Sequence, residues 1–198
     1  FPNAKICASS DLDEQIIRDL RQQGACIDTW GVGTKLITSE NCPALGGVYK
    51  LAEVERHGKM QPRIKISENF WKITNPGYKK VVRIYDGATE KAIADLIMLD
   101  HEQIDVSRPL TIFDPVETWK RMTISNYYIK ELLVPIFQGG KQVYESPGMM
   151  ASRDYAKKDL DTFWAEYRRP YRPHIYKVDL SQELFDLKHE LLGESARH

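Results

Sequence analysis

The first thirty residues show a hydrophobic pattern that changes period twice. Residues 4–8 form a short apolar run, long enough for one buried strand. Apolar residues then recur at helical spacing between positions 12 and 20, and a second apolar run covers residues 25–30. The order strand, helix, strand predicts a βαβ unit whose two strands are parallel neighbours.

Local signals set the expected ends of the helix in this unit. Asp11 and Glu14 have the spacing of a capping box, which places the first helical residue at Leu12. Gly24 follows the last apolar residue of the pattern and is expected at the C′ position, where glycine adopts a left-handed conformation at little cost.

The middle of the chain has the alternation typical of strands rather than a helical period. Strands are expected at residues 48–54, 63–66, 81–85, 92–99 and 110–113. Turn sequences separate them, including Asn75-Pro76-Gly77 and Asp86-Gly87. Short strands joined by tight turns predict a largely antiparallel region.

The last third combines one hairpin with two helices. Residues 132–137 and 141–144 flank Gly139-Gly140, which predicts a hairpin. An amphipathic pattern predicts a helix over residues 154–168, whose aromatic side chains we take as core. A leucine stripe predicts a closing helix over residues 181–192.

The composition favours a folded domain without a strong overall charge. Of the 198 residues, 42% are hydrophobic, and the 28 Lys and Arg residues balance 28 Asp and Glu residues. A neutral chain has no global field that would attract nucleic acid or a membrane surface, so a bound phosphate must be held by local geometry.

The cysteines and the lack of long apolar runs indicate a cytoplasmic protein. Cys7, Cys26 and Cys42 make an odd number without a CxxC pair or metal-ligand spacing, and we expect those in apolar runs to be buried and reduced. No apolar run approaches the roughly 18 residues of a membrane span, and no secretory signal pattern is present.

The most specific chemical signal is the turn Gly31-Val32-Gly33-Thr34, at the end of the second predicted strand. Glycines permit close backbone approach and positive φ, so that several N–H groups and a Thr hydroxyl can point at one phosphate. Ser10 and Asp11 follow the neighbouring strand and should lie at the same rim. These residues predict a sugar-phosphate site; the alternative is that the glycines only make a tight turn and Asp11 only caps a helix.

The Lys and Arg residues of the middle region allow two interpretations. Lys50, Arg63 and Lys65 fall in the expected middle strands, where they either reach an anion or face solvent. A basic cluster around the Pro-Gly turn has the same two interpretations; its members are Lys72, Lys79, Lys80 and Arg83. None of the five histidines lies near the two rims in sequence or pairs at metal-ligand spacing, so we assign none a catalytic role and predict no metal ligands.

Several long motifs resemble one enzyme family. They are ICASSDLDE, IDTWGVGTKLITSENCPALGGVYKL, KITNPGYKKVVRIYD and FWAEYRRPYRPHIYKVDLSQELFDLKHELL, and in this order they look like the C-terminal part of bacterial nicotinate phosphoribosyltransferases. The resemblance implies an α/β fold, with residues 1–45 as the end of an irregular phosphoribosyltransferase barrel. It further implies a β-rich part of a companion domain over 46–150 and a helical segment over 151–198.

The same resemblance implies an activity and its partners. Enzymes of this family form nicotinate mononucleotide and diphosphate from nicotinate and 5-phosphoribosyl 1-diphosphate, using ATP and Mg²⁺ as a homodimer in NAD biosynthesis. Carried over, Ser10 and Asp11 would lie by the ribose or its phosphate, and Gly31, Gly33 and Thr34 would cradle the 5′-phosphate. Lys50 would reach the diphosphate bound in the neighbouring subunit.

The resemblance also implies what this chain lacks. The phosphorylated histidine and the nicotinate-binding residues of the family would precede residue 1, so we expect the 198 residues alone to be inactive. The rival hypothesis is a non-catalytic module that binds a nucleotide phosphate or serves assembly.

Overall fold

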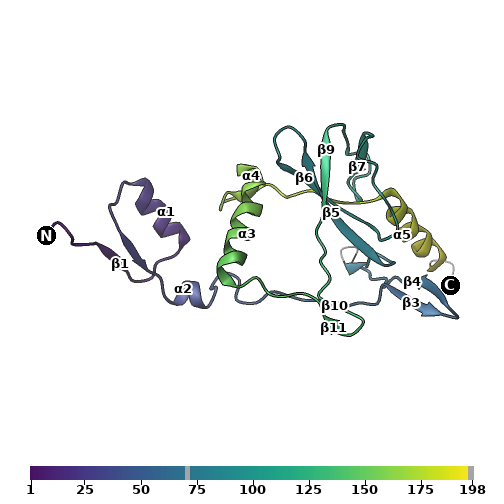
Figure 1. Cartoon of the computed structure of the whole chain (residues 1–198), viewed down its shortest axis with the longest axis horizontal. Coiled ribbons are helices and arrows are strands. Elements are labelled where there is room, and N and C mark those ends of the chain that lie inside the picture. Colours follow the sequence, from purple (N-terminus) through teal and green to yellow (C-terminus); the bar gives the residue numbers. More distant parts are fainter. Residues whose placement is uncertain (70–71, 196–198) are drawn as a thin grey trace. The chain divides into compact units, whose positions relative to one another are not determined.

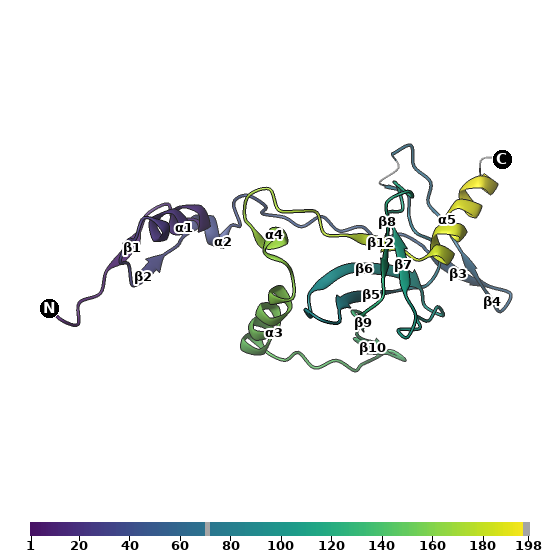
Figure 2. The same cartoon turned by 90° about the horizontal axis from the view of Figure 1, so that it is seen from above.

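The computed structural model describes residues 1–69 and 72–195 and divides the chain into two compact units. The first unit is Phe1–Tyr49, and the second begins at Lys50. Both are α/β in character; Figure 1 labels most of their elements, and Figure 2 adds the labels of β2, β8 and β12. No helix among the described residues is long and apolar enough to cross a membrane.

The first unit is the predicted βαβ arrangement. Its elements are β1 (Cys7–Ser9), α1 (Glu14–Gln22), β2 (Thr29–Gly31) and the short α2 (Thr34–Ile37). β1 and β2 pair in parallel, which confirms the sequence prediction, although both strands are shorter than expected.

The start of α1 differs from the prediction. Asp13, not Asp11, is the N-cap: its Oδ1 accepts hydrogen bonds from the amides of Gln15 at 3.0 Å and Ile16 at 2.8 Å. Asp11 instead has φ +47°, within the turn that precedes the cap. Gly24 has φ +82° just beyond the C-cap, which confirms its C′ role.

The first unit buries little of its own apolar surface. Among residues 1–49, Leu12 alone is buried. Cys7, Cys26 and Cys42 are free but exposed, so the prediction of buried thiols is wrong. One helix packed on a two-stranded sheet covers a single face, which leaves the other side of each strand open.

The second unit is built around a four-stranded mixed sheet. Its order is β12 (Val178–Leu180), β6 (Ala92–Leu99), β5 (Lys79–Asp86) and β9 (Tyr127–Glu131). β5 is antiparallel to both neighbours, as predicted, whereas β12 is parallel to β6. β12 has only three residues, too few to show a hydrophobic period in the sequence.

In the described part of the second unit, three two-stranded hairpins accompany this sheet. They are β3 (Glu53–Arg56) with β4 (Lys59–Pro62), β7 (Leu110–Phe113) with β8 (Arg121–Ile124), and β10 (Phe137–Gln138) with β11 (Lys141–Gln142). The strands predicted at 48–54 and 63–66 are wrong in place, because His57 and Gly58 adopt positive φ and turn the chain between them. The hairpin at Gly139-Gly140 is confirmed.

The predicted helix over 154–168 is two helices. α3 (Met149–Asp161) ends at Thr162, and α4 (Ala165–Arg168) begins after Trp164, whose extended ψ of 153° interrupts the helix. The closing helix α5 (Gln182–Ser195) is confirmed; the Oγ of Ser181 accepts a hydrogen bond from the amide of Leu184 at its start.

Two apolar clusters hold the second unit together. The larger joins the sheet to the β7–β8 hairpin and contains Val82, Ile84, Ala94, Leu96, Met98, Ile112, Ile124 and Tyr127. The smaller joins α5 to the sheet through Leu99, Leu180 and Leu184. Figure 2 shows α5 next to β12. Burial of this kind contributes about 1.5–3 kcal/mol per large apolar side chain.

A partly buried ion-pair network fastens α3 to the sheet. Arg83 Nε lies 2.8 Å from Asp95 Oδ1, and its Nη1 lies 2.9 Å from Asp159 Oδ2 on α3. The hydrogen bond with Asp95 raises the pKa of Arg83. Arg83 is therefore engaged inside the protein, and the possibility that it contributes to a basic cluster for an external anion is wrong.

Candidate functional site

The predicted rim residues lie together where two parallel strands end. Ser9 of β1 stands opposite Gly31 of β2 in the register. Ser10 and Asp11 therefore leave β1 beside the chain that continues from β2 through Gly33. Ligands of parallel sheets sit beyond such strand ends.

The backbone after β1 is in a rarely populated conformation. Ser10 has φ +83° and Asp11 has φ +47°, although neither is glycine. Each such residue costs on the order of 1–3 kcal/mol, and conformations of this kind concentrate at binding and catalytic sites. Ser39, His57, Glu90 and Arg172 also have positive φ, so this conformation supports the rim hypothesis only together with the adjacent glycine turn.

The two glycines have different structural roles. A Cβ on Gly31 would lie 3.2 Å from Ser9 Cβ, so the absence of a side chain allows the two strand ends to approach. A Cβ on Gly33 would have no atom within 4 Å and would project into open space. Neither glycine has positive φ, so that part of the expectation is wrong, and close approach of the turn to a phosphate stays a prediction.

The backbone amides of the turn are available as donors. Gly33 is the N-cap of α2, and its carbonyl accepts hydrogen bonds from the amides of Leu36 and Ile37, both at 3.1 Å. Within the described part of the chain, no hydrogen bond is recorded from the amides of Gly33 or Thr34. The start of α1 is different, because Asp13 already occupies the amides of Gln15 and Ile16. An anion at this rim is therefore expected at residues 33–34 rather than at α1.

Lys35 is a cation of the rim that the sequence analysis missed. Its Nζ lies 3.0 Å from Asp13 Oδ2 and 3.8 Å from Glu40 Oε2. The hydrogen bond to Asp13 raises the pKa of Lys35. The bond from Ile16 N, and after it the bond from Lys35, lowers the pKa of Asp13. No periodic pattern connects positions 13 and 35; only the βαβ register brings them together.

Lys50 does not share a unit with the rim residues. It is the first residue of the second unit, and its Nζ donates to the carbonyl oxygen of Lys72 at 2.9 Å. Lys79 of the predicted basic cluster likewise donates to the carbonyl oxygens of Pro76 and Gly77.

The structure thus brings together five of the predicted site residues: Ser10, Asp11, Gly31, Gly33 and Thr34. The role of Lys50 stays a prediction.

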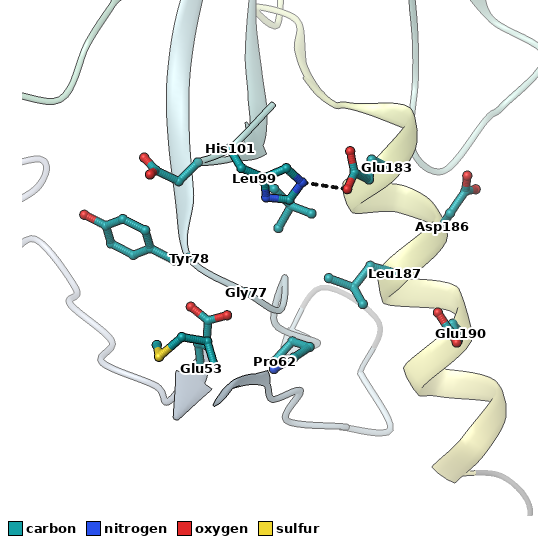
Figure 3. Close-up of a pocket in the computed structure, with 12 residues that line it drawn as sticks. Glu53, Pro62, Gly77, Tyr78, Leu99, His101, Glu183, Asp186, Leu187 and Glu190 are labelled. Atoms are coloured by element: carbon teal, nitrogen blue, oxygen red, sulfur yellow. Dashed lines mark hydrogen bonds and ion pairs between the residues drawn. The ribbon is translucent and has the colours of Figure 1, made fainter. Parts of the chain in front are cut away.

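A cavity of about 570 Å³ in the second unit has the wrong charge for a phosphate (Figure 3). Five carboxylates line it: Glu53, Asp100, Glu183, Asp186 and Glu190. The one histidine there, His101, places its Nε2 2.7 Å from Glu183 Oε1. Its negative potential disfavours anions. In residues 1–69 and 72–195, no group of three or more His, Cys, Asp or Glu side chains is arranged to hold a metal ion.

Comparison with known proteins identifies the family. Residues 78–188, more than half of the chain, match the model of the nicotinate phosphoribosyltransferase C-terminal domain. The chain belongs to the nicotinate phosphoribosyltransferase family. The matched segment lies within the second unit, so the rim of β1 and β2 lies outside it.

Relatives of this family align with both units. A nicotinate phosphoribosyltransferase of Bacillus subtilis strain 168 is 44% identical over 98% of this chain and 40% of its own length. One from Dictyostelium discoideum is 33% identical over 98% of this chain and 34% of its own length. The crystal structure of human nicotinic acid phosphoribosyltransferase covers 96% of this chain and 33% of its own, with 26% identity and a TM-score of 0.72. The chain therefore spans about two-fifths or less of these relatives.

Proposed function

We propose that this chain is the C-terminal portion of an enzyme that forms nicotinate mononucleotide and diphosphate from nicotinate and 5-phosphoribosyl 1-diphosphate. Its relatives carry the name of this activity. The observation that carries the proposal is the pair of amides at Gly33 and Thr34, beside the strained Ser10 and Asp11 at the end of two parallel strands.

The first unit would hold the ribose phosphate of the donor. Displacement at the anomeric carbon passes through an oxocarbenium-like state, so the enzyme must fix the ribose, hold the leaving diphosphate and aim the base. In this scheme Gly31, Gly33 and Thr34 cradle the 5′-phosphate, and Ser10 and Asp11 contact the ribose. Fixing both reactants supplies roughly 7–11 kcal/mol of barrier lowering in favourable cases.

The proposal also covers the fold of the first unit, the role of Lys50 and the environment of the cysteines. The first unit would be the end of an irregular α/β barrel, and its single buried apolar residue, Leu12, is consistent with strands that pack against further chain. Lys50 would serve the diphosphate site of a second subunit in a homodimer. The exposed free thiols of Cys7, Cys26 and Cys42 favour a reducing, cytoplasmic environment.

ATP and Mg²⁺ would act at residues of the enzyme other than those that the structure describes. The described residues contain no group of three or more His, Cys, Asp or Glu side chains arranged to hold a metal, so we assign Mg²⁺ to none of them. Mg²⁺ commonly enters a site with substrate phosphates. The histidine that couples ATP to the reaction would belong to the portion of the relatives that this chain does not cover.

A complementation assay tests the proposal. The chain is assayed with nicotinate, phosphoribosyl diphosphate, Mg²⁺ and ATP, alone and then with the separately expressed part of the Bacillus subtilis relative that it does not cover. We expect nicotinate mononucleotide only after mixing, and less of it when the chain carries Thr34→Ala. Turnover by the chain alone would contradict the claim that it needs the remaining part of the enzyme. Phosphate binding without activity in the mixture would favour a non-catalytic module.

A further inference from the structure

A second cavity in the second unit has the opposite chemistry to the acidic one. It has a volume of about 850 Å³ and is lined by α3, α4 and the segment that leads to β12. Binding sites for small molecules commonly enclose about 300–1,000 Å³. None of its lining residues belongs to the rim of β1 and β2.

One wall of this cavity is aromatic. Phe163 and Tyr176 meet edge to face with ring centroids 5.0 Å apart, and Tyr167 meets Tyr176 in the same way at 5.4 Å. The sequence predicts core positions for the aromatic residues of this region, but Phe163 and Tyr167 are only half-buried, and neighbouring Trp164 is 45% exposed. Phe163 and Tyr167 line the cavity, whereas Trp164 does not.

The aromatic wall is held in place from behind. The guanidinium carbon of Arg83 lies 4.7 Å from the centre of the Phe163 ring, and the Tyr176 hydroxyl donates to Asp95 Oδ1 at 3.0 Å. The amide of Ala92 donates to the carbonyl of Thr162 at 2.9 Å. The wall is therefore anchored to the partly buried ion-pair network and to the sheet.

The cavity also carries excess positive charge. Arg153 and Lys157 stand four residues apart on α3, so both side chains lie on one face of the helix. Arg168 on α4 pairs with Asp161 at 2.9 Å, which neutralises both. Within the described residues, no ion pair engages Arg153 or Lys157.

We propose that this cavity binds a nucleoside monophosphate, which combines a planar aromatic base with an anionic phosphate. The base would stack against Phe163 and Tyr167, and the phosphate would contact Arg153 and Lys157. Stacking on aromatic side chains accepts any planar base, and Arg and Lys supply charge-assisted hydrogen bonds to phosphate oxygens. The proposal holds whether or not the chain contributes to the transferase reaction.

The test is a titration of the whole ¹⁵N-labelled chain followed by NMR, in a Gly33→Ala background so that the candidate phosphate turn does not contribute. AMP and nicotinate mononucleotide serve as probes with a ring and a phosphate and distinguish the purine from the pyridine class. Adenosine lacks the phosphate, and ribose 5-phosphate lacks the ring. We expect saturable shifts of the amides around Phe163 and Tyr167 with one or both nucleotides, and affinities at least about tenfold lower for adenosine and ribose 5-phosphate.

Two variants of α3 make the test specific. Lys157→Ala removes a lining cation and should weaken nucleotide binding at least about fivefold. Lys158→Ala removes the adjacent lysine, which does not line the cavity, and should change the affinity less than about twofold. Both positions are exposed on a helix, where alanine preserves folding. The proposal is overturned if neither nucleotide shifts these amides, if both variants weaken binding equally, or if ribose 5-phosphate binds as well as the tighter of the two nucleotides.

Discussion

Asp13 and Lys35, 22 residues apart in sequence, join the two loops of the candidate phosphate site. Asp13 Oδ1 caps α1, while its Oδ2 lies 3.0 Å from Lys35 Nζ in α2. One carboxylate therefore fixes both the helix that follows β1 and the helix that follows the glycine turn. This tie holds Gly33 and Thr34 beside the end of β1 without occupying their amides.

Removing this carboxylate should loosen the first unit. We expect Asp13→Ala to lower the stability of α1 by about 1 kcal/mol, because the amides of Gln15 and Ile16 lose their cap. Asp13→Asn keeps a capping oxygen but not the charge, so it should retain most of that stability. Amide hydrogen exchange in α1 measures the difference. Equal protection in the wild type and Asp13→Ala would contradict the capping role.

The same group predicts a dependence on acid pH. Hydrogen bonds from Ile16 N and Lys35 lower the pKa of Asp13 below its ordinary value of 3.8, so folding favours the ionised form. The stabilisation is therefore fully present above about pH 4 and is lost as pH falls through the lowered pKa. Protection of the α1 amides should decline over that range in the wild type. It should decline less in Asp13→Asn, and identical profiles would rule out Asp13 as the titrating group.

Arg83 should be a major determinant of stability in the second unit. Arg83→Met leaves the buried carboxylate of Asp95 without its partner, and we expect a loss of about 3 kcal/mol in the free energy of unfolding. Urea denaturation measures this loss. The matched control is Arg108→Met, which breaks the exposed pair with Asp105 and should cost less than about 1 kcal/mol. Similar losses in both variants would show that the Arg83 network contributes no more than a surface pair.

Lys50 should affect one substrate and not the other. In the complemented enzyme, Lys50→Ala is expected to raise the KM for phosphoribosyl diphosphate and leave that for nicotinate nearly unchanged, because a cation at the diphosphate does not touch the pyridine ring. Lys59→Ala, at an exposed lysine of β4, is the charge-matched control. Unchanged kinetics for both substrates would contradict a role for Lys50 at the diphosphate and leave it only the structural hydrogen bond with Lys72.

The sequence contained enough to predict the parallel pair of β1 and β2, the glycine turn and the apolar stripe of α5, because each has a local period or turn signature. It did not reveal the N-cap Asp13 or the partner Lys35, since their contact depends on the register of two strands. The single helix expected over 154–168 divides at Thr162 and Trp164, where the chain turns so that Phe163 packs on Arg83. Tertiary contacts of that kind override a helical pattern.

The central claim, that Gly33 and Thr34 hold a sugar phosphate, is tested most directly by following their two amides. The ¹⁵N-labelled chain is titrated with ribose 5-phosphate and, as a control, with ribose. We predict saturable shifts of the Gly33 and Thr34 amides with the phosphate only. Thr34→Ala should weaken binding about tenfold, because a hydroxyl donor to a charged group is lost. Gly33→Ala should abolish the shifts, because its methyl group enters the open space above the turn. Shifts that are absent, or that persist unchanged in Gly33→Ala, would contradict the account.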